Sequence, residues 1–324
     1  MTKQDDPSET HKTCCSARRE GGAGAAAPAI KGRASDALQS AVDAMMVPLP
    51  GGFFEMGARK NRYPADMDAP RRRVHVNPFK IGRTTIPNHL FARFVAETGY
   101  ETTAETEKWS YVFHLFVEDD EKYPNSPLET PWWRQVHGAI WSAPEGPGTD
   151  WTGREDHPAV HISWFDAAAF ADYVGCRLPR EAEWEYAARG GLKGKRFPWG
   201  NTLEPESGHR HNVWQGKFPY INTEEDGFAG TCPVDHFPPN DFGLFNMTGN
   251  VWEWCADDWG PLPGQVNKLI RDPVRTGSGE QKVIRGGSHM CHASYCERYQ
   301  VHSRTQNTPD STTTHTGFRL VAEC

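Results

Sequence analysis

The sequence predicts one large α+β domain with long loops, and three observations lead to this prediction. The 324-residue chain holds 31 glycines and 25 prolines, more than is usual, which indicates many turns. Helical spacing of apolar residues occurs only before about residue 192. Beyond it, short β-type runs such as 282–285 and 317–321 alternate with Gly-, Pro- and Asn-rich loops. Because no repeat or interior linker divides the chain, one domain explains its length better than two.

The first 44 residues are polar and Ala/Gly-rich and lack a sustained apolar period. We therefore expect a disordered N-terminal tail over 1–44 and a single folded domain over 45–324. The tail contains Cys14 and Cys15. A redox relay is one interpretation of this pair, but an incidental pair of thiols is simpler, and we assign it no role.

Apolar patterning places the first elements of the folded domain. The run over 46–57 is apolar and broken by Pro and Gly, which predicts a β-hairpin. Short strands are expected over 74–76 and 79–81. A helix is predicted over 88–98, with its first residue, Asn88, as N-cap and a glycine directly after its last residue.

Two further helices follow from capping signals. The first is predicted over 163–176, because Ser163 is an N-cap residue and Asp166 follows it three positions later. The second, over 179–189, is stopped by two glycines. Its charged residues are most simply interpreted as a solvated face with one i,i+4 ion pair: Glu183, Glu185 and Arg189.

Charge and hydropathy exclude several classes of partner. The formal net charge of −7 provides no basic field for nucleic acid or anionic lipid. No run approaches the roughly 18 apolar residues of a membrane helix, and the N-terminus lacks a secretory apolar run. We therefore expect no nucleic-acid or membrane partner, a cytoplasmic location, and mostly reduced thiols among the eight cysteines.

Cys291 and Cys296 form the densest cluster of reactive side chains, with His292 between them. On a straight strand the two cysteines would be about 16 Å apart on opposite faces, so they converge only across a turn or bulge. Two converging thiolates suit Cu(I), whereas zinc requires three or four ligands and His292 is the only sequence neighbour able to add one. Buried structural thiols are the alternative interpretation.

Two loop regions carry the oxygen donors that bind Ca²⁺, which are carboxylates, amides and carbonyls next to glycines. One region contains Asn212, Val213 and residues 225–228, and the other runs over 246–253. Composition alone favours Asx-turns and solvated carboxylates, and neither loop has EF-hand spacing. Trp252, in the second loop, is interpreted as a core residue or as the wall of a pocket.

The chain resembles the formylglycine-generating enzymes, also called sulfatase-modifying factors, from about Val47 to Val321. The motifs of the wider superfamily are Pro-Gly-Gly-Phe-Phe-Glu-Met-Gly at 50–57, Thr-Gly-Tyr at 98–100, Pro-Trp-Trp at 131–133, His-Pro-Ala-Val-His-Ile-Ser-Trp at 157–164 and the run 177–191. The segments that distinguish the enzymes are 212–216, 249–254, 286–296 and 304–311. The chain departs from the family pattern at His289, 300–303 and His315.

The resemblance implies a C-type-lectin-like α+β fold with little regular secondary structure. It implies a bacterial-type oxidoreductase that oxidises a cysteine in a C-x-P-x-R segment of an unfolded sulfatase to Cα-formylglycine, with O₂ as co-substrate. Cys291 and Cys296 would hold Cu(I), leaving an open position for the substrate thiol. Ser288 and His292 would act in polar positioning, and Trp252 would wall the pocket. We expect a monomer.

The resemblance also implies two structural calcium ions. One site would use Asn212, the Val213 carbonyl, Asp226 and the Phe228 carbonyl. The other would use Asn246, the Gly249 and Val251 carbonyls, and Glu253.

Three alternatives share the fold. A non-catalytic lectin-like paralogue would bind sulfatases or glycans without turnover, although the family's inactive paralogue lacks both cysteines. A metal-free thiol–disulfide oxygenase would use the same pair. An iron-dependent sulfoxide synthase is disfavoured, because residues 1–45 contain no His-x-x-x-His-x-Glu motif.

Overall fold

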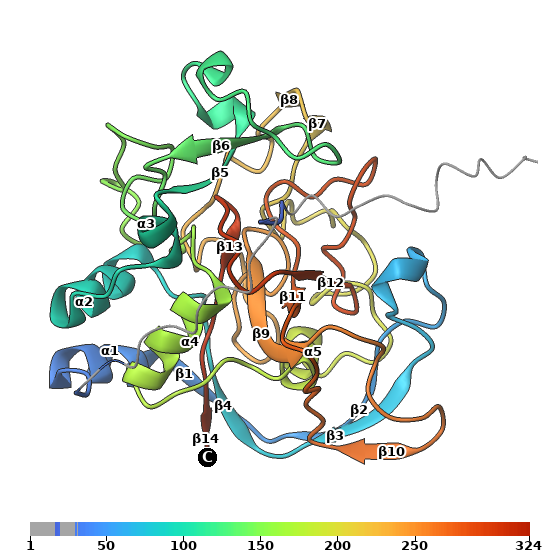
Figure 1. Cartoon of the computed structure of the whole chain (residues 1–324). Coiled ribbons are helices and arrows are strands. Elements are labelled where there is room, and N and C mark those ends of the chain that lie inside the picture. The colour runs from blue at the N-terminus through green and yellow to red at the C-terminus, as the bar shows by residue number, and fades with distance from the viewer. Residues whose placement is uncertain (1–16, 20–29, 31) are drawn as a thin grey trace, which may run out of the picture.

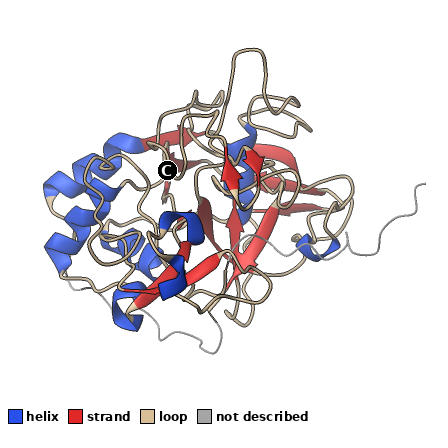
Figure 2. Ribbon diagram, turned by 90° about the horizontal axis from the view of Figure 1, so that it is seen from above, coloured by secondary structure: helices blue, strands red, loops and turns tan. Residues whose placement is uncertain are grey.

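The computed structural model describes residues 17–19, 30 and 32–324 (Figure 1). The predicted tail therefore lies largely outside the described residues, as do Cys14 and Cys15. Figure 2 shows most of the helices gathered at one side of the molecule and many loops connecting the strands. Among the described residues, no helix is long and apolar enough to cross a membrane. The observed architecture is the loop-rich α+β type that the sequence predicts.

The helices are short and lie in the first two-thirds of the chain. They are α1 (Asp36–Met45), α2 (Asn88–Thr98), α3 (Thr103–Glu107), α4 (Trp164–Tyr173) and α5 (Glu181–Arg189), with 3₁₀ turns η2 (Pro64–Asp66), η3 (His114–Phe116) and η4 (Asp120–Lys122). The predicted helices α2, α4 and α5 are confirmed. Ser163 and Asp166 form the expected capping box of α4, whereas α2 begins after Pro87 without a side-chain cap.

The strands form several small sheets instead of one continuous layer. They are β1 (Met46–Leu49), β2 (Gly52–Met56), β3 (Arg72–Val76), β4 (Phe79–Gly82), β5 (Trp109–Phe113), β6 (Trp133–His137), β7 (Gly216–Lys217), β8 (Ile221–Asn222), β9 (Trp252–Asp258), β10 (Leu269–Arg271), β11 (Lys282–Arg285), β12 (Arg304–Asn307), β13 (Thr316–Gly317) and β14 (Val321–Glu323). The strand orders are β1-β4-β14, β10-β3-β2, β12-β11-β9-β13, β5-β6 and β7-β8.

The predicted hairpin over 46–57 is wrong, although both of its strands exist. β1 pairs with β4 and β2 pairs with β3, so the two strands enter different sheets. The break lies at Gly51, whose φ is +66° and where an added Cβ would lie 2.4 Å from the Val76 carbonyl oxygen. Only glycine tolerates this close approach.

The folded part begins earlier than the predicted boundary at residue 45. Ser35 accepts a hydrogen bond from the Leu38 amide at 3.2 Å and caps α1. The helix buries Leu38, Val42 and Met45 against the largest apolar cluster. These three residues have the i, i+4, i+7 spacing of an amphipathic helix, and the surrounding polar and alanine-rich sequence masks it.

The interpretation of α5 as a solvated face is wrong. Glu183, Glu185 and Arg189 are all buried. Glu185 pairs with Arg189 at 2.6 Å as predicted, but it also pairs with Arg285 of β11 at 2.6 Å. The helix therefore packs its charged residues inward, where opposite charges compensate for lost hydration.

Candidate active site

A tight turn brings Cys291 and Cys296 together after strand β11. The amides of Tyr295 and Cys296 both donate to the His292 carbonyl, at 3.0 and 2.8 Å, and the Cys291 amide donates to the Ser288 carbonyl at 2.9 Å. This is the turn that convergence of the two cysteines requires. Both cysteines are fully buried and belong to the largest apolar cluster.

The two sulfur atoms are 3.5 Å apart. A disulfide would place them about 2.05 Å apart, so the pair is not bonded to each other. Two collinear metal–sulfur bonds of about 2.3 Å would place them about 4.6 Å apart, so a linear ion requires about 1 Å of outward movement. The described residues contain no group of three or more His, Cys, Asp or Glu able to hold a metal. A two-thiol donor set fits Cu(I), which accepts few soft ligands.

Each sulfur also has a nitrogen donor beside it. The Ser288 amide donates to Cys291 Sγ at 3.4 Å. Arg298 Nη1 lies 3.7 Å from Cys296 Sγ. A backbone N–H and a guanidinium both stabilise negative charge on sulfur, which favours the thiolate that binds metals.

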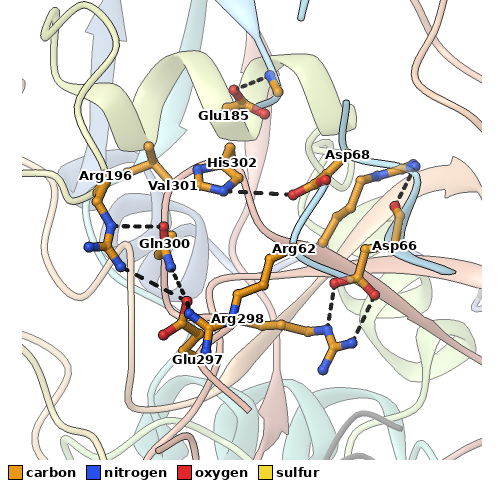
Figure 3. A network of polar contacts seen from close by, with 12 residues as sticks. Arg62, Asp66, Asp68, Glu185, Arg196, Glu297, Arg298, Gln300, Val301 and His302 are labelled. Carbon is orange, nitrogen blue, oxygen red and sulfur yellow. Dashed lines mark hydrogen bonds and ion pairs between the residues drawn. The ribbon is translucent and has the colours of Figure 1, made fainter. Parts of the chain in front are cut away.

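Arg298 belongs to the network of polar contacts shown in Figure 3. Its guanidinium makes a two-pronged ion pair with Asp66, at 2.7 and 2.9 Å, and lies 4.2 Å above the ring of Tyr63. Burial raises the pKa of Asp66, although Arg298 opposes this shift. Glu297, next in the chain to Cys296, pairs with Arg62 on the exposed side.

A cleft of about 440 Å³ lies over this network. Its floor includes Asp68, whose Oδ2 is 3.7 Å from His302 Nε2. Burial, followed by repulsion from Asp66, raises the pKa of Asp68 to about 7. Burial lowers the pKa of His302 to about 4, so the imidazole is neutral at pH 7. The Cys296 end of the turn is therefore bordered by closely spaced charges.

The Cys291 end of the turn borders an aromatic cluster instead. Met290 packs with Trp214, Phe113 and Trp133, and the Trp214 amide donates to the Cys291 carbonyl at 3.2 Å. Tyr295, within the turn, stacks on Phe218 with ring centroids 5.2 Å apart. This end of the turn lies against rings instead of charged groups.

The remaining predicted catalytic residues are Ser288, Trp252 and His292, and they differ in burial and in their contacts. Ser288 is buried and directs its amide to Cys291, while its hydroxyl accepts from the Met290 amide at 3.3 Å. Trp252, on β9, is fully buried in the apolar cluster that holds both cysteines. His292 is half-buried, and its Nδ1 lies 2.8 Å from the Ser294 hydroxyl. Burial lowers the pKa of His292.

Two residues predicted to bind calcium at the first loop, Asn212 and Asp226, are buried. Asn212 donates its amide to the Gly230 carbonyl at 2.7 Å, but its buried Oδ1 has no hydrogen-bond partner in the described part of the chain. Asp226 is also buried and accepts from the amides of Val213 and Phe228, at 3.0 and 3.1 Å. An orphaned amide oxygen in the same loop cluster as a buried carboxylate is a donor set that fits a hard cation.

The second predicted calcium loop fits less well. The Asn246 Oδ1 is likewise buried and without a hydrogen-bond partner among the described residues. The Glu253 carboxylate, however, accepts from Arg319 at 2.5 and 2.7 Å and from Trp184 Nε1 at 2.8 Å. A cation at this loop would compete with Arg319 for the same oxygens.

Sequence reasoning missed the residues that are brought to the turn from far along the chain. Asp66 and Arg298 are 232 residues apart, and no local spacing connects them. Tyr63 lies in the same early loop. The only available signal is that Arg298 follows Cys296 by two residues, which is too weak to assign a role.

The described residues thus define a loop-rich α+β protein with a buried pair of thiols in a turn. A family model described as the sulfatase-modifying factor enzyme 1-like domain matches residues 33–324. The formylglycine-generating enzyme of Thermomonospora curvata is 50% identical over 289 residues, covering 86% of this chain and 93% of the relative. The inactive Cα-formylglycine-generating enzyme 2 of Mus musculus is 43% identical over 291 residues, covering 88% of each.

The fold also matches a solved structure. PvdO from Pseudomonas aeruginosa has a TM-score of 0.59 and 23% identity, covering 86% of this chain and 94% of that one. At this identity the match concerns the fold alone. The chain belongs to the sulfatase-modifying factor enzyme 1-like family.

Proposed function

We propose that this protein is a formylglycine-generating oxidase. It converts a cysteine in a C-x-P-x-R segment of an unfolded sulfatase into Cα-formylglycine, with Cu(I) as cofactor and O₂ as acceptor. The observation that carries the proposal is the convergence of two buried sulfurs at 3.5 Å in a chain 50% identical to a protein named formylglycine-generating enzyme. The inactive relative makes a non-catalytic role the alternative that the experiment must exclude.

In this proposal Cys291 and Cys296 hold the copper. When bound, Cu(I) would supply a binding position for the substrate thiolate and the redox chemistry with O₂. The Ser288 amide and the Arg298 guanidinium lower the energy of the two protein thiolates, because each places a positive dipole or charge beside a sulfur.

Other residues shape the surroundings of the thiols. Trp252 and Tyr299 pack in the same apolar cluster as both cysteines and exclude water from them. Burial raises the pKa of Tyr299, so its phenol stays neutral at physiological pH. His292, on the partly exposed side of the turn, is available for contact with a substrate.

The test is aldehyde formation. The full chain, loaded with Cu(I), is incubated in air with a C-x-P-x-R peptide, and the product is measured by mass spectrometry. Aldehyde is expected from the wild type and from Cys324→Ser, an exposed cysteine that serves as the matched control. Cys291→Ser and Cys296→Ser are expected to produce none.

Two results would contradict the proposal. Absence of aldehyde from copper-loaded wild type would favour the non-catalytic alternative. Activity that survives a strong Cu(I) chelator would favour a metal-free thiol oxygenase. The cytoplasmic location and monomeric state are part of the proposal, and cell fractionation and sedimentation velocity test them.

We also propose that Ca²⁺ binds the first loop, through Asn212, Asp226 and the Val213 and Phe228 carbonyls, and the second loop, through Asn246, Glu253 and the Gly249 and Val251 carbonyls. Calcium at about 100 times its Kd would stabilise the fold by about 2.7 kcal/mol per site. Asp226→Asn should remove about half of the calcium-dependent rise in Tm, because the second site remains, while Asp235→Asn, an exposed control, should leave the rise unchanged. An unchanged calcium response in Asp226→Asn contradicts the first site.

A further inference from the structure

Residues 17–19 are docked on the body of the protein, against residues far along the chain. They form the short dark-blue stretch separated from the rest of the coloured chain in Figure 1. Their backbone is held by side chains: Asn307 donates to the Ala17 carbonyl at 2.9 Å, Tyr111 to the Arg18 carbonyl at 3.2 Å, and the Arg19 amide donates to Ser311 at 3.0 Å. These three bonds attach the segment to β5, to β12 and to the loop that follows β12.

The Arg19 side chain fills a buried position. Its guanidinium donates to the Trp109 carbonyl at 2.6 Å and to the Thr312 hydroxyl at 3.0 Å. It also lies 3.8 Å from the centre of the Trp109 ring, and Glu107 is 3.9 Å from its Nη1. A carbonyl, a hydroxyl, a ring face and a carboxylate together form a position suited to one arginine.

Ala17 lies in the aromatic cluster at the Cys291 end of the turn. The cluster that buries it contains Trp214, whose amide bonds the Cys291 carbonyl, and Met290, the residue before Cys291. Ala17 is 1% exposed, whereas Arg18 is exposed to solvent. The docked segment therefore approaches the proposed copper site with one face buried and the other in solvent.

The sequence of this segment matches the proposed substrate motif with a single change. Residues 15–19 read Cys-Ser-Ala-Arg-Arg, which is C-x-A-x-R, with alanine in place of proline. A second register, starting at Cys14, would assign the arginine position to Arg18, which is exposed. The structure buries the alanine and the arginine of the first register.

The alternation of burial supports the first register. In an extended segment, side chains two residues apart face the same side. Ala17 and Arg19 share the buried side, as the proline and arginine positions of the motif require.

We propose that residues 17–19 are an intramolecular occupant of the sulfatase-binding groove, with Ala17 in the proline position and Arg19 in the arginine position. This inference rests on the proposed function, because it assigns the groove through the C-x-P-x-R motif. An external sulfatase segment must displace the chain's own N-terminal segment before it binds. The N-terminal segment thereby sets a threshold of substrate concentration for the enzyme.

The expected effect follows from the occupied fraction. If the N-terminal segment fills the groove about nine-tenths of the time, the apparent Kd for an external peptide rises about tenfold. A tether supports such occupancy because its effective concentration is on the order of millimolar. Occupancy changes KM and leaves kcat unchanged, since a bound external substrate has already displaced the segment.

The experiment compares Arg19→Ala with Arg18→Ala in the full chain. Binding is measured anaerobically by fluorescence anisotropy with a labelled S-x-P-x-R peptide, which carries no oxidisable cysteine. Arg19→Ala should tighten the Kd on the order of tenfold and lower the KM for a C-x-P-x-R peptide equally, with kcat unchanged. Arg18→Ala, which removes the same charge from an exposed position, should match the wild type.

The two proposals fail in distinguishable ways. Wild-type aldehyde formation with an unchanged Kd and KM in Arg19→Ala would overturn the intramolecular occupant and leave the oxidase in place. A tighter Kd in Arg19→Ala without aldehyde from any variant would overturn the oxidase and leave the occupied groove. Equal effects of Arg18→Ala and Arg19→Ala would also overturn the occupant, because they would reflect charge alone.

Discussion

The two ends of the cysteine turn lie in opposite environments. At the Cys291 end, Met290 and Trp214 belong to an uncharged aromatic cluster. At the Cys296 end, Arg298 and Asp66 begin a network of closely spaced charges. The two ends of the turn therefore have different roles. The aromatic end buries Ala17 of the docked segment, while the charged end places the Arg298 guanidinium beside Cys296 Sγ.

The largest expected effect concerns the charged end. Asp66→Asn breaks the buried Asp66–Arg298 ion pair, which costs about 3–5 kcal/mol of unfolding free energy. Urea denaturation measures this loss. Formylglycine formation should fall at the same time, because the released guanidinium no longer has a fixed position beside Cys296. An unfolding free energy equal to that of the wild type would show that the Asp66–Arg298 pair does not stabilise the fold.

The next largest effect is a pH dependence of stability that comes from Asp68, at the charged end. Burial, and then the charge of Asp66, raises the folded-state pKa of Asp68 from its usual value of 3.8 to about 7. The stabilising contribution of protonated Asp68 is therefore complete below about pH 4 and is lost as the pH rises through 7. Asp68→Asn should be more stable than wild type by on the order of 2–4 kcal/mol at pH 8 and equal to it near pH 3.5.

Thermal unfolding across this pH range measures the difference. The nearby His302 does not reproduce the effect, because burial lowers its pKa to about 4, so its contribution to stability rises with pH instead of falling. A parallel pH dependence in the wild type and Asp68→Asn would contradict the assignment.

A smaller effect tests the aromatic end. Phe218 stacks on Tyr295 and packs against Trp214, so Phe218→Leu should reduce stability by about 1 kcal/mol without any dependence on salt. On the proposed function, the KM for a C-x-P-x-R peptide should rise while kcat changes little, since Phe218 packs on the rings of Tyr295 and Trp214. A changed kcat with constant KM would contradict the role assigned to the aromatic end.

The smallest effect is expected for Arg62, at the exposed edge of the charged end. Arg62 pairs with Glu297, but its side chain is largely exposed. Arg62→Ala should therefore change the unfolding free energy by less than about 1 kcal/mol, and high salt should remove even that difference. A loss comparable to that of Asp66→Asn would place Arg62 inside the buried network.

Features that depend on local sequence were predictable. Ser163 and Asp166 cap α4 as their spacing indicates, and Gly190 ends α5 with a φ of +53°. The need for a turn between Cys291 and Cys296 also followed from strand geometry alone. In each case the determining residues lie within a few positions of one another.

Features that depend on distant partners were not predictable from the single sequence. The sequence pattern predicted that Glu185 is solvated. In the structure it is buried and accepts a hydrogen bond from Arg285, which is 100 residues away. β1 and β2 looked like a hairpin, yet their partners are β4 and β3. Local spacing specifies an element, whereas the tertiary partner decides which face is buried.

The spacing of the two sulfurs has a practical consequence for purified protein. At 3.5 Å the pair is about 1 Å short of a linear metal bridge and about 1.5 Å beyond a covalent S–S bond. If the pair holds copper as proposed, an oxidised pair and a metal-loaded pair exclude each other. Titration with a chromogenic thiol reagent after denaturation would then count the molecules whose pair is oxidised and cannot bind the metal.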